Sequence, residues 1–324
     1  MPVAGVDYPA TFQQLTSWFR DDDACREYLA ELRWGKGFVC PACGGGEFWK
    51  TAAGLWMCRA CQRRTSVTAG TIFHGSRLPL TTWFAAVWFV CSQKTGVSAL
   101  GLQRVLGFGS YETAWAWLHK LRRAMVRPDR ERLAGLVEVD ETYIGAIKRD
   151  RRRHGRGTDK TLVVIAVETP PGEHRLGRVR LSRVPNASTN ALCGFVGYSV
   201  TKGATVRTDG LGAYRRLAAD GYDHQPVNVV ASGRPAHVTL PGAHRVAALL
   251  KRWLTGTLHN GVSDKHLDFY LDEFTFRFNR RTSRSRGLLF YRLLQQATAT
   301  DPQPWNDLIA EPLDTYIWDE PRLQ

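Results

Sequence analysis

The chain of 324 residues is too long for one average domain and long enough for two or three. Its content of 44% hydrophobic and 11% aromatic residues supports large cores and excludes wholesale disorder. A formal net charge of +14, from 44 lysines and arginines against 30 acidic residues, favours a phosphate-rich partner, because each neutralised phosphate releases counterions. No basic and apolar segments typical of a signal peptide open the chain, and the most apolar run, residues 83–91, is too short for a membrane span.

Residues 1–36 are predicted to form an N-terminal helical segment. Apolar residues between positions 11 and 33 recur at helical spacing, and the aspartates Asp21 to Asp23 indicate a turn or a helix cap within this run. We interpret the segment as a packing element.

Four of the seven cysteines follow a metal-binding spacing. Two pairs, each with two intervening residues, are separated by fourteen residues, and the four are Cys40, Cys43, Cys58 and Cys61. Four thiolates arranged in this way bind Zn²⁺ tetrahedrally, and the short apolar runs around them are typical of strands. We therefore predict a structural zinc ribbon at residues 37–72, in a reducing compartment, rather than a disulfide scaffold. The ribbon is either a folding staple alone or, given the arginines beside the second pair, also a DNA contact.

Residues 78–127 are predicted to contain three helices. Ser98 is expected to cap the second helix, Gly107 to Gly109 form a tight turn, and Ser110 opens the third helix with a capping signal. A helix, a short glycine turn and a helix with a basic end are typical of a helix-turn-helix that reads a DNA groove, although a three-helix bundle without a DNA role gives the same pattern. The candidate DNA-binding residues at the basic end are Lys120, Arg122 and Arg123.

From residue 136 the hydrophobic period changes from that of helices to that of strands. Strands are predicted at 136–144, 161–168, 177–184, 205–208 and 227–230, with helices after the third, fourth and fifth. This order predicts an α/β protein with a ribonuclease-H-like fold, a mixed sheet with flanking helices in which the first and fourth strands are neighbours. We assign residues 133–296 to this catalytic domain and residues 297–324 to a C-terminal tail without a predicted role.

Two aspartates of these strands are the candidate catalytic residues. Asp140 lies within the first strand and Asp209 follows the fourth, so the predicted topology brings them together. Two carboxylates at one place form an oxygen site for Mg²⁺ or Mn²⁺. Strand alternation predicts that Glu138 shares the face of Asp140 and that Glu141 points away. The alternative is a solvated strand residue or a turn former, which suits Asp140 less well because burying an unpaired charge is costly.

A basic loop, residues 148–160, follows the first strand. Such a loop is usually solvated, but beside a carboxylate site that acts on DNA it is suited to hold phosphates. Its candidate DNA-binding residues are Lys148, Arg149, Arg151, Arg152 and Arg153.

Five motifs, at residues 137–145, 208–210, 244–246, 251–254 and 270–281, resemble those of a known family. They read Val-Glu-Val-Asp-Glu-Thr-Tyr-Ile-Gly, Thr-Asp-Gly, His-Arg-Val, Lys-Arg-Trp-Leu and Tyr-Leu-Asp-Glu-Phe-Thr-Phe-Arg-Phe-Asn-Arg-Arg. Together with the ribbon they resemble the zinc-ribbon transposases of bacterial insertion sequences, the IS1595 or ISXO2-like family of the DDE superfamily. The resemblance covers most of residues 11–296. It implies a metal-dependent polynucleotidyl transferase that cuts DNA at the ends of its element and joins the freed 3′-hydroxyls to a target.

The resemblance also implies a variable third catalytic residue (Glu, Asn or His) and a lysine seven residues after it. His244 and Lys251 match this spacing, which is nearly two helical turns and places both side chains on one face. A neutral imidazole is a poorer ligand for Mg²⁺ than for Mn²⁺, so His244 either binds the metal or positions the attacking water. Lys251 is expected near a phosphate. Glu273 is the alternative third carboxylate, and Leu249 departs from the asparagine of many relatives.

We therefore predict a DNA transposase that binds the ends of an insertion sequence and carries out metal-dependent cleavage and strand transfer. The alternatives are a nuclease on the same fold, and a DNA-binding regulator or inactive relative that uses only the zinc ribbon and the helix-turn-helix. The resemblance implies double-stranded DNA as the partner, in the form of terminal repeats and target. It also implies a homo-oligomer that pairs two ends and a location in the bacterial cytoplasm at the nucleoid, without membrane association.

Overall fold

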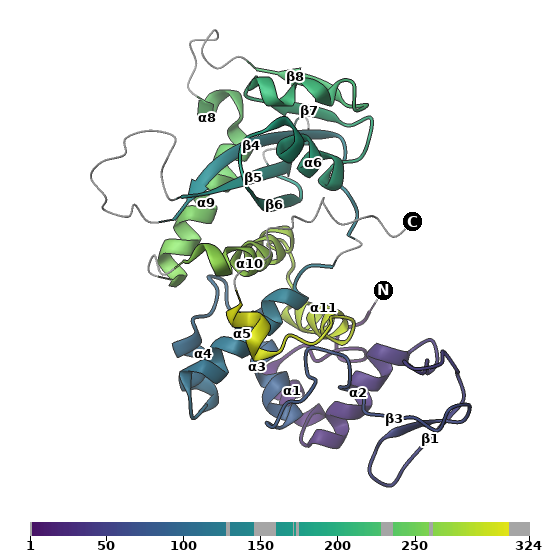
Figure 1. Cartoon of the computed structure of the whole chain (residues 1–324). Helices are drawn as coiled ribbons and strands as arrows, with labels where there is room; N and C mark the ends of the chain where they lie inside the picture. Colours follow the sequence, from purple (N-terminus) through teal and green to yellow (C-terminus); the bar gives the residue numbers. More distant parts are fainter. Residues whose placement is uncertain are drawn as a thin grey trace. The chain divides into compact units, whose positions relative to one another are not determined.

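The computed structural model describes residues 2–127, 130–145, 160–170, 172, 175–227, 236–258 and 262–310. The chain divides into two compact units. Met1–Arg127 and Thr282–Ala310 form the first, and Pro128–Arg281 forms the body of the second (Figure 1).

The first unit is mainly helical. The run predicted as one helix is divided into α1 (Phe12–Trp18) and α2 (Asp22–Trp34), because the side chain of Asp21 accepts the backbone N–H of Ala24 and caps a new helix. The further helices of this unit are α3 (Leu80–Ser92), α4 (Ala99–Leu106), α5 (Tyr111–Ala124), α11 (Arg286–Thr298) and α12 (Trp305–Ile309). As predicted, Ser98 caps α4 and Ser110 caps α5, and each serine side chain accepts a backbone N–H of the first turn.

Aromatic side chains form the core of this unit. The ring of Phe84 lies 4.6 Å from that of Phe19 and 5.7 Å from that of Phe290, between centroids. Trp83 stacks on Trp117 at 3.5 Å and joins α3 to α5. The fully buried Phe290 brings α11 into the first unit, whereas the sequence analysis assigned residues up to 296 to the strand-containing domain. An apolar helix face shows that a helix packs but not on which unit it packs.

A small antiparallel sheet completes the first unit. Its strands are β1 (Phe48–Lys50), β2 (Trp56–Cys58) and β3 (Arg64–Thr65), paired in that order. Phe38, Phe48 and Trp56 pack beside it with ring centroids 4.3–5.8 Å apart. This core is small for a stable domain, so a bound metal would add substantially to its stability.

The second unit contains a five-stranded sheet in the order β6-β5-β4-β7-β8. Strand β5 pairs antiparallel with both β4 and β6, and β7 pairs parallel to β4. The pairing of β4 with β7 confirms that the predicted first and fourth strands are neighbours. The last described strand, β8 (Asp223–Pro226), is polar and pairs only with β7, so the apolar pattern did not reveal it. The strand predicted at 227–230 lies, beyond residue 227, outside the described residues. The other strands are β4 (Leu136–Ile144), β5 (Thr161–Glu168), β6 (Val179–Val184) and β7 (Thr205–Thr208).

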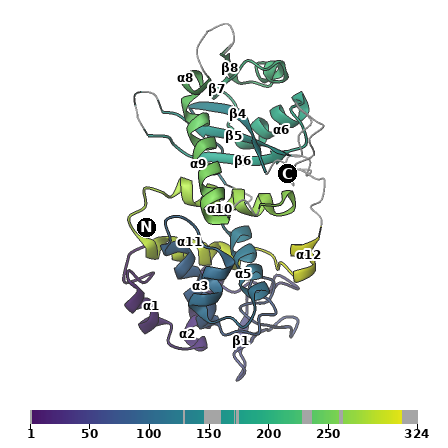
Figure 2. The same ribbon diagram turned by 90° about the vertical axis from the view of Figure 1, so that its left-hand side faces the viewer.

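Helices cover both faces of the sheet, as in a ribonuclease-H-like fold (Figures 1 and 2). Val137 and Val139 point to the core under α6 (Thr189–Ser199) and η1 (Gly212–Leu217). The opposite face packs against α9 (Pro241–Leu258) and α10 (Leu267–Asn279), which follow the short α8 (Ala236–Thr239) and η2 (Asp264–His266). Among the described residues, every helix is too short or too polar to span a bilayer.

Candidate active site

Strands β4 and β7 bring the two predicted aspartates together. Their parallel pairing extends to Glu138 opposite Arg207, so two residues further Asp140 lies level with Asp209, just after the end of β7. Asp209 accepts the backbone N–H of Leu211 at 2.9 Å, which turns the chain away from the strand. Asp140 and Asp209 each offer a carboxylate oxygen to a group whose atoms lie within 4.8 Å of one another.

Glu141 is the third member of this carboxylate group. The expectation that it points away is therefore wrong. Strand alternation places its Cβ on the α6 side of the sheet. The pairing of β4 with β7 ends at Glu138, so beyond this residue the side chain can extend past the end of β7 towards Asp209. The hydroxyl of the buried Tyr214 donates to Oε1 of Glu141 and holds it there.

Burial gives this group its electrostatic character. It raises the pKa of Asp140, and it raises the pKa of Glu141 from 4.5 to about 7, with the charges of Asp209 and Asp140 adding to the effect on Glu141. Partly dehydrated carboxylates at close range repel one another, and a divalent cation between them relieves both the repulsion and the loss of solvation. The donor set, all carboxylate oxygen, fits Mg²⁺ or Mn²⁺.

His244 faces the carboxylates from helix α9. Its Nε2 atom lies 3.4 Å from Oδ2 of Asp140, and its side chain is 37% exposed. Lys251 lies on the same helix, seven residues further along, and is exposed. Leu249 packs against the core between α9, α10 and the sheet.

Glu273, the alternative third carboxylate, does not join the group. It is 1% exposed, and the guanidinium of Arg277 donates to its Oε1 at 2.7–2.8 Å. Glu273 lies on the buried face of α10, where its carboxylate forms an ion pair with Arg277 of the same helix and is separate from the carboxylate group of Asp140, Glu141 and Asp209.

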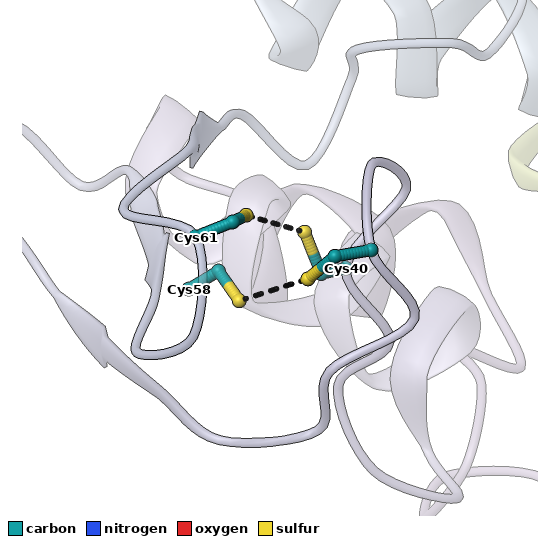
Figure 3. A group of neighbouring side chains, drawn as sticks. Cys40, Cys58 and Cys61 are labelled. Carbon is teal, nitrogen blue, oxygen red and sulfur yellow. Dashed lines mark hydrogen bonds between the residues drawn. The ribbon is translucent and has the colours of Figure 1, made fainter.

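Among the described residues, the four cysteines form a second group of side chains that could hold a metal ion (Figure 3). Sγ of Cys40 lies 3.6 Å from Sγ of Cys61, and Sγ of Cys43 lies 3.6 Å from Sγ of Cys58. Tetrahedral Zn²⁺ with Zn–S bonds of about 2.3 Å places its sulfurs about 3.8 Å apart. A disulfide would need about 2.05 Å. The geometry therefore fits zinc. Without a metal the thiols share protons, so the pKa of Cys40 is lowered, chiefly by the backbone N–H of Ala42, while the neighbouring thiols raise the pKa of Cys43.

The predicted DNA-binding residues divide into three groups. Arg123 is exposed and Lys120 is half-buried on α5. Arg122 is 2% exposed and donates to the carbonyl of Val97 at 3.4 Å, so it supports the helix packing and is not available to DNA. Lys148, Arg149, Arg151, Arg152 and Arg153 lie outside the described residues.

The sequence analysis missed Glu141 and Tyr214 as members of the site. The period of the strand gave the direction of the Cβ of Glu141 but not where the neighbouring strand ends. Nothing in the sequence around Tyr214 indicates that its hydroxyl contacts a carboxylate of another strand, because that contact exists only in the folded sheet.

Comparisons with known proteins show which family the chain resembles. Residues 132–279 match the model of the ISXO2-like transposase domain, and residues 20–64 match that of the transposase zinc-ribbon domain. A protein of Halobacterium salinarum, described as an uncharacterized protein in transposable element ISH50, is 28% identical over 271 residues. The alignment covers 77% of this chain and 88% of that protein.

Proposed function

Because the chain belongs to the ISXO2-like family of zinc-ribbon transposases, we propose that it cleaves the ends of an insertion sequence and joins them to target DNA. The observation that carries the proposal is that Asp140 on β4 lies beside both Asp209, just after the end of β7, and His244 on α9. The carboxylates come from neighbouring parallel strands and the imidazole from the helix that covers them. A set of this kind can bind divalent metal and act on a phosphodiester.

In this proposal Asp140 and Asp209 hold Mg²⁺ or Mn²⁺, and Glu141 completes the oxygen set. The bound cations would activate the attacking oxygen and stabilise the leaving oxygen. Water attacks a phosphorus at the element end and frees a 3′-hydroxyl, which then attacks a phosphorus of the target and releases a target 3′-hydroxyl. His244 accepts a proton from the attacking oxygen or orients it.

The remaining parts bring DNA to this site. Zn²⁺ held by the four cysteines orders the ribbon. We propose that DNA phosphates are bound by Arg123 and by the basic residues Lys148, Arg149, Arg151, Arg152 and Arg153, and that Lys251 holds the phosphate beside His244. Pairing two element ends requires at least two protomers, so we propose a homo-oligomer on the DNA, located at the nucleoid.

A strand-transfer assay tests the function. Labelled DNA with the terminal repeats of the element, a plasmid target and Mg²⁺ or Mn²⁺ is incubated with the protein, Asp140→Ala or Asp209→Ala. Asp301→Asn, at an exposed carboxylate of the other unit, is the matched control. Joined products that need both aspartates and metal are expected. Cleavage without joining would indicate a nuclease, and binding to the repeats without cleavage would indicate a DNA-binding regulator.

A further inference from the structure

Glu138 is a buried carboxylate without a role in the proposed chemistry. It is 2% exposed and lies on β4, two residues before Asp140 and on the same face. Its side chain meets the first turn of α9, where Oε2 accepts the backbone N–H of Ala243 at 3.0 Å. Burial raises the pKa of Glu138, and the backbone N–H groups of Ala243 and Gly242 oppose this rise by favouring the charged form.

This contact meets a need of the helix. The first N–H groups of an α-helix have no partner within the helix, and its N-terminus carries a partial positive charge. The first residue, Pro241, has no N–H, so the next N–H groups are those of Gly242 and Ala243. One carboxylate therefore compensates this buried helix end in both hydrogen bonding and charge.

Gly242 shows how closely α9 approaches the sheet at this point. A Cβ atom on Gly242 would lie 2.9 Å from Oε2 of Glu138 and 2.7 Å from Cγ2 of Thr169. Both distances are shorter than ordinary van der Waals contacts, so a larger residue would force either the Glu138 carboxylate or the helix to move, and either shift would break the contact between them. The glycine and the carboxylate together determine the distance between helix and strand.

The next residue after Ala243 is His244, whose Nε2 atom lies 3.4 Å from Asp140. The strand therefore contacts the helix twice, through Glu138 at its backbone and through Asp140 at its imidazole. We propose that Glu138 is a positioning residue, which anchors the N-terminus of α9 and so holds His244 against Asp140. The inference rests on the proposed function, in which this pair acts on DNA.

The test measures the contact between Asp140 and His244 directly. The ring signal of His244 is followed by ¹H–¹³C NMR in the full chain with zinc bound, without DNA or divalent metal, and is assigned with His244→Asn. In the wild-type background, Asp140→Asn should shift this signal. In Glu138→Ala and Gly242→Ala backgrounds the shift should be lost, because the imidazole has left the carboxylate.

Glu168→Ala is the matched control. Glu168 also accepts two backbone N–H groups, but those of Ala134 and Arg178 and not those of α9. This variant should lower the melting temperature and retain the Asp140-dependent shift of His244. If Glu138→Ala does not fold, Gly242→Ala decides the question. Retention of the full shift in the folded anchor variants would overturn the proposal.

DNA cleavage gives an independent second readout. Misplacing a catalytic group by about 1 Å can lower a rate about 10²-fold, so Glu138→Ala and Gly242→Ala should reduce cleavage by about that factor. Adding His244→Ala to either variant should then change the rate little. If the wild-type chain does not cleave DNA, the proposed function fails, while the NMR shifts still decide the role of Glu138.

Discussion

Nε2 of His244 lies 3.4 Å from Oδ2 of Asp140, although one residue belongs to helix α9 and the other to strand β4. A carboxylate beside an imidazole fixes the orientation of the ring, so the Nδ1 atom of His244 has a defined direction relative to Asp209 and Glu141. A group oriented in this way suits proton transfer to or from an oxygen at the carboxylates.

We predict that His244→Ala lowers DNA cleavage by about 10²-fold or more, because general acid–base catalysis contributes 10²- to 10⁴-fold. Single-turnover rates in Mg²⁺ and Mn²⁺ measure the effect. A similar loss in both metals indicates proton transfer or positioning of water, whereas a larger loss in Mn²⁺ indicates that the imidazole binds the metal.

Lys251 has its own matched control on the same helix. Lys251→Ala should lower the rate of DNA cleavage, because the lysine holds the phosphate beside His244. Arg252→Ala removes the exposed neighbouring cation and should change the same single-turnover cleavage rate little. Equal losses in the two variants would show that only general positive charge matters here.

Tyr214→Phe removes the hydroxyl that donates to Glu141. Loss of a group that hydrogen-bonds a metal-binding carboxylate typically lowers metal affinity about 10- to 100-fold. We therefore predict that Tyr214→Phe binds Mn²⁺ more weakly by about that factor. Isothermal titration calorimetry measures it. The control is Tyr222→Phe, since Tyr222 lies in the same core and donates to the carbonyl of Val200 at 3.3 Å. Unchanged Mn²⁺ affinity in Tyr214→Phe would exclude Glu141 from the metal site.

The raised pKa of Glu141, about 7, predicts opposite pH effects on stability and on metal binding. The folded metal-free chain binds this proton more tightly than the unfolded chain does. Its contribution to stability is therefore present below the ordinary pKa of 4.5 and is lost as the pH rises through about 7. Mn²⁺ needs the deprotonated carboxylate, so its affinity should rise over the same range and then level off.

Melting temperatures and Mn²⁺ titrations between pH 5 and 8 check both signs. Glu141→Gln cannot titrate and should flatten both dependences. If Mn²⁺ affinity in the wild-type protein stays constant over this range, Glu141 does not bind the metal as a titrating ligand.

Local patterns revealed the zinc site, and strand order revealed the pair of aspartates. The cysteine spacing confines four thiols to a small volume, and the parallel neighbours β4 and β7 leave Asp140 and Asp209 little freedom. The features that sequence did not reveal depend on tertiary contacts. Glu141 reaches the site because the pairing between β4 and β7 ends at Glu138. Arg122 is buried, although the sequence analysis expected the basic end of its helix to face DNA.

Removal of zinc should unfold the ribbon and leave the second unit folded. The aromatic core of Phe38, Phe48 and Trp56 is too small to hold the strands without the metal. Cys58→Ser should therefore release zinc and change the tryptophan fluorescence. The control is Cys25→Ala, because burial raises the pKa of Cys25 to about 12 and keeps it as an inert thiol. A zinc content unchanged by Cys58→Ser would exclude this site.

DNA binding should distinguish two adjacent arginines of α5. Arg123 is exposed, so Arg123→Ala should weaken binding to the element ends and reduce the slope of log K against log salt by about 0.9 for one lost phosphate contact. Arg122→Ala removes a buried guanidinium that donates to Val97, so it should lower the melting temperature and leave the slope of the folded protein unchanged. Fluorescence anisotropy over a salt series measures both variants. The same slope in Arg123→Ala as in the wild-type protein would mean that this end of α5 does not contact the DNA backbone.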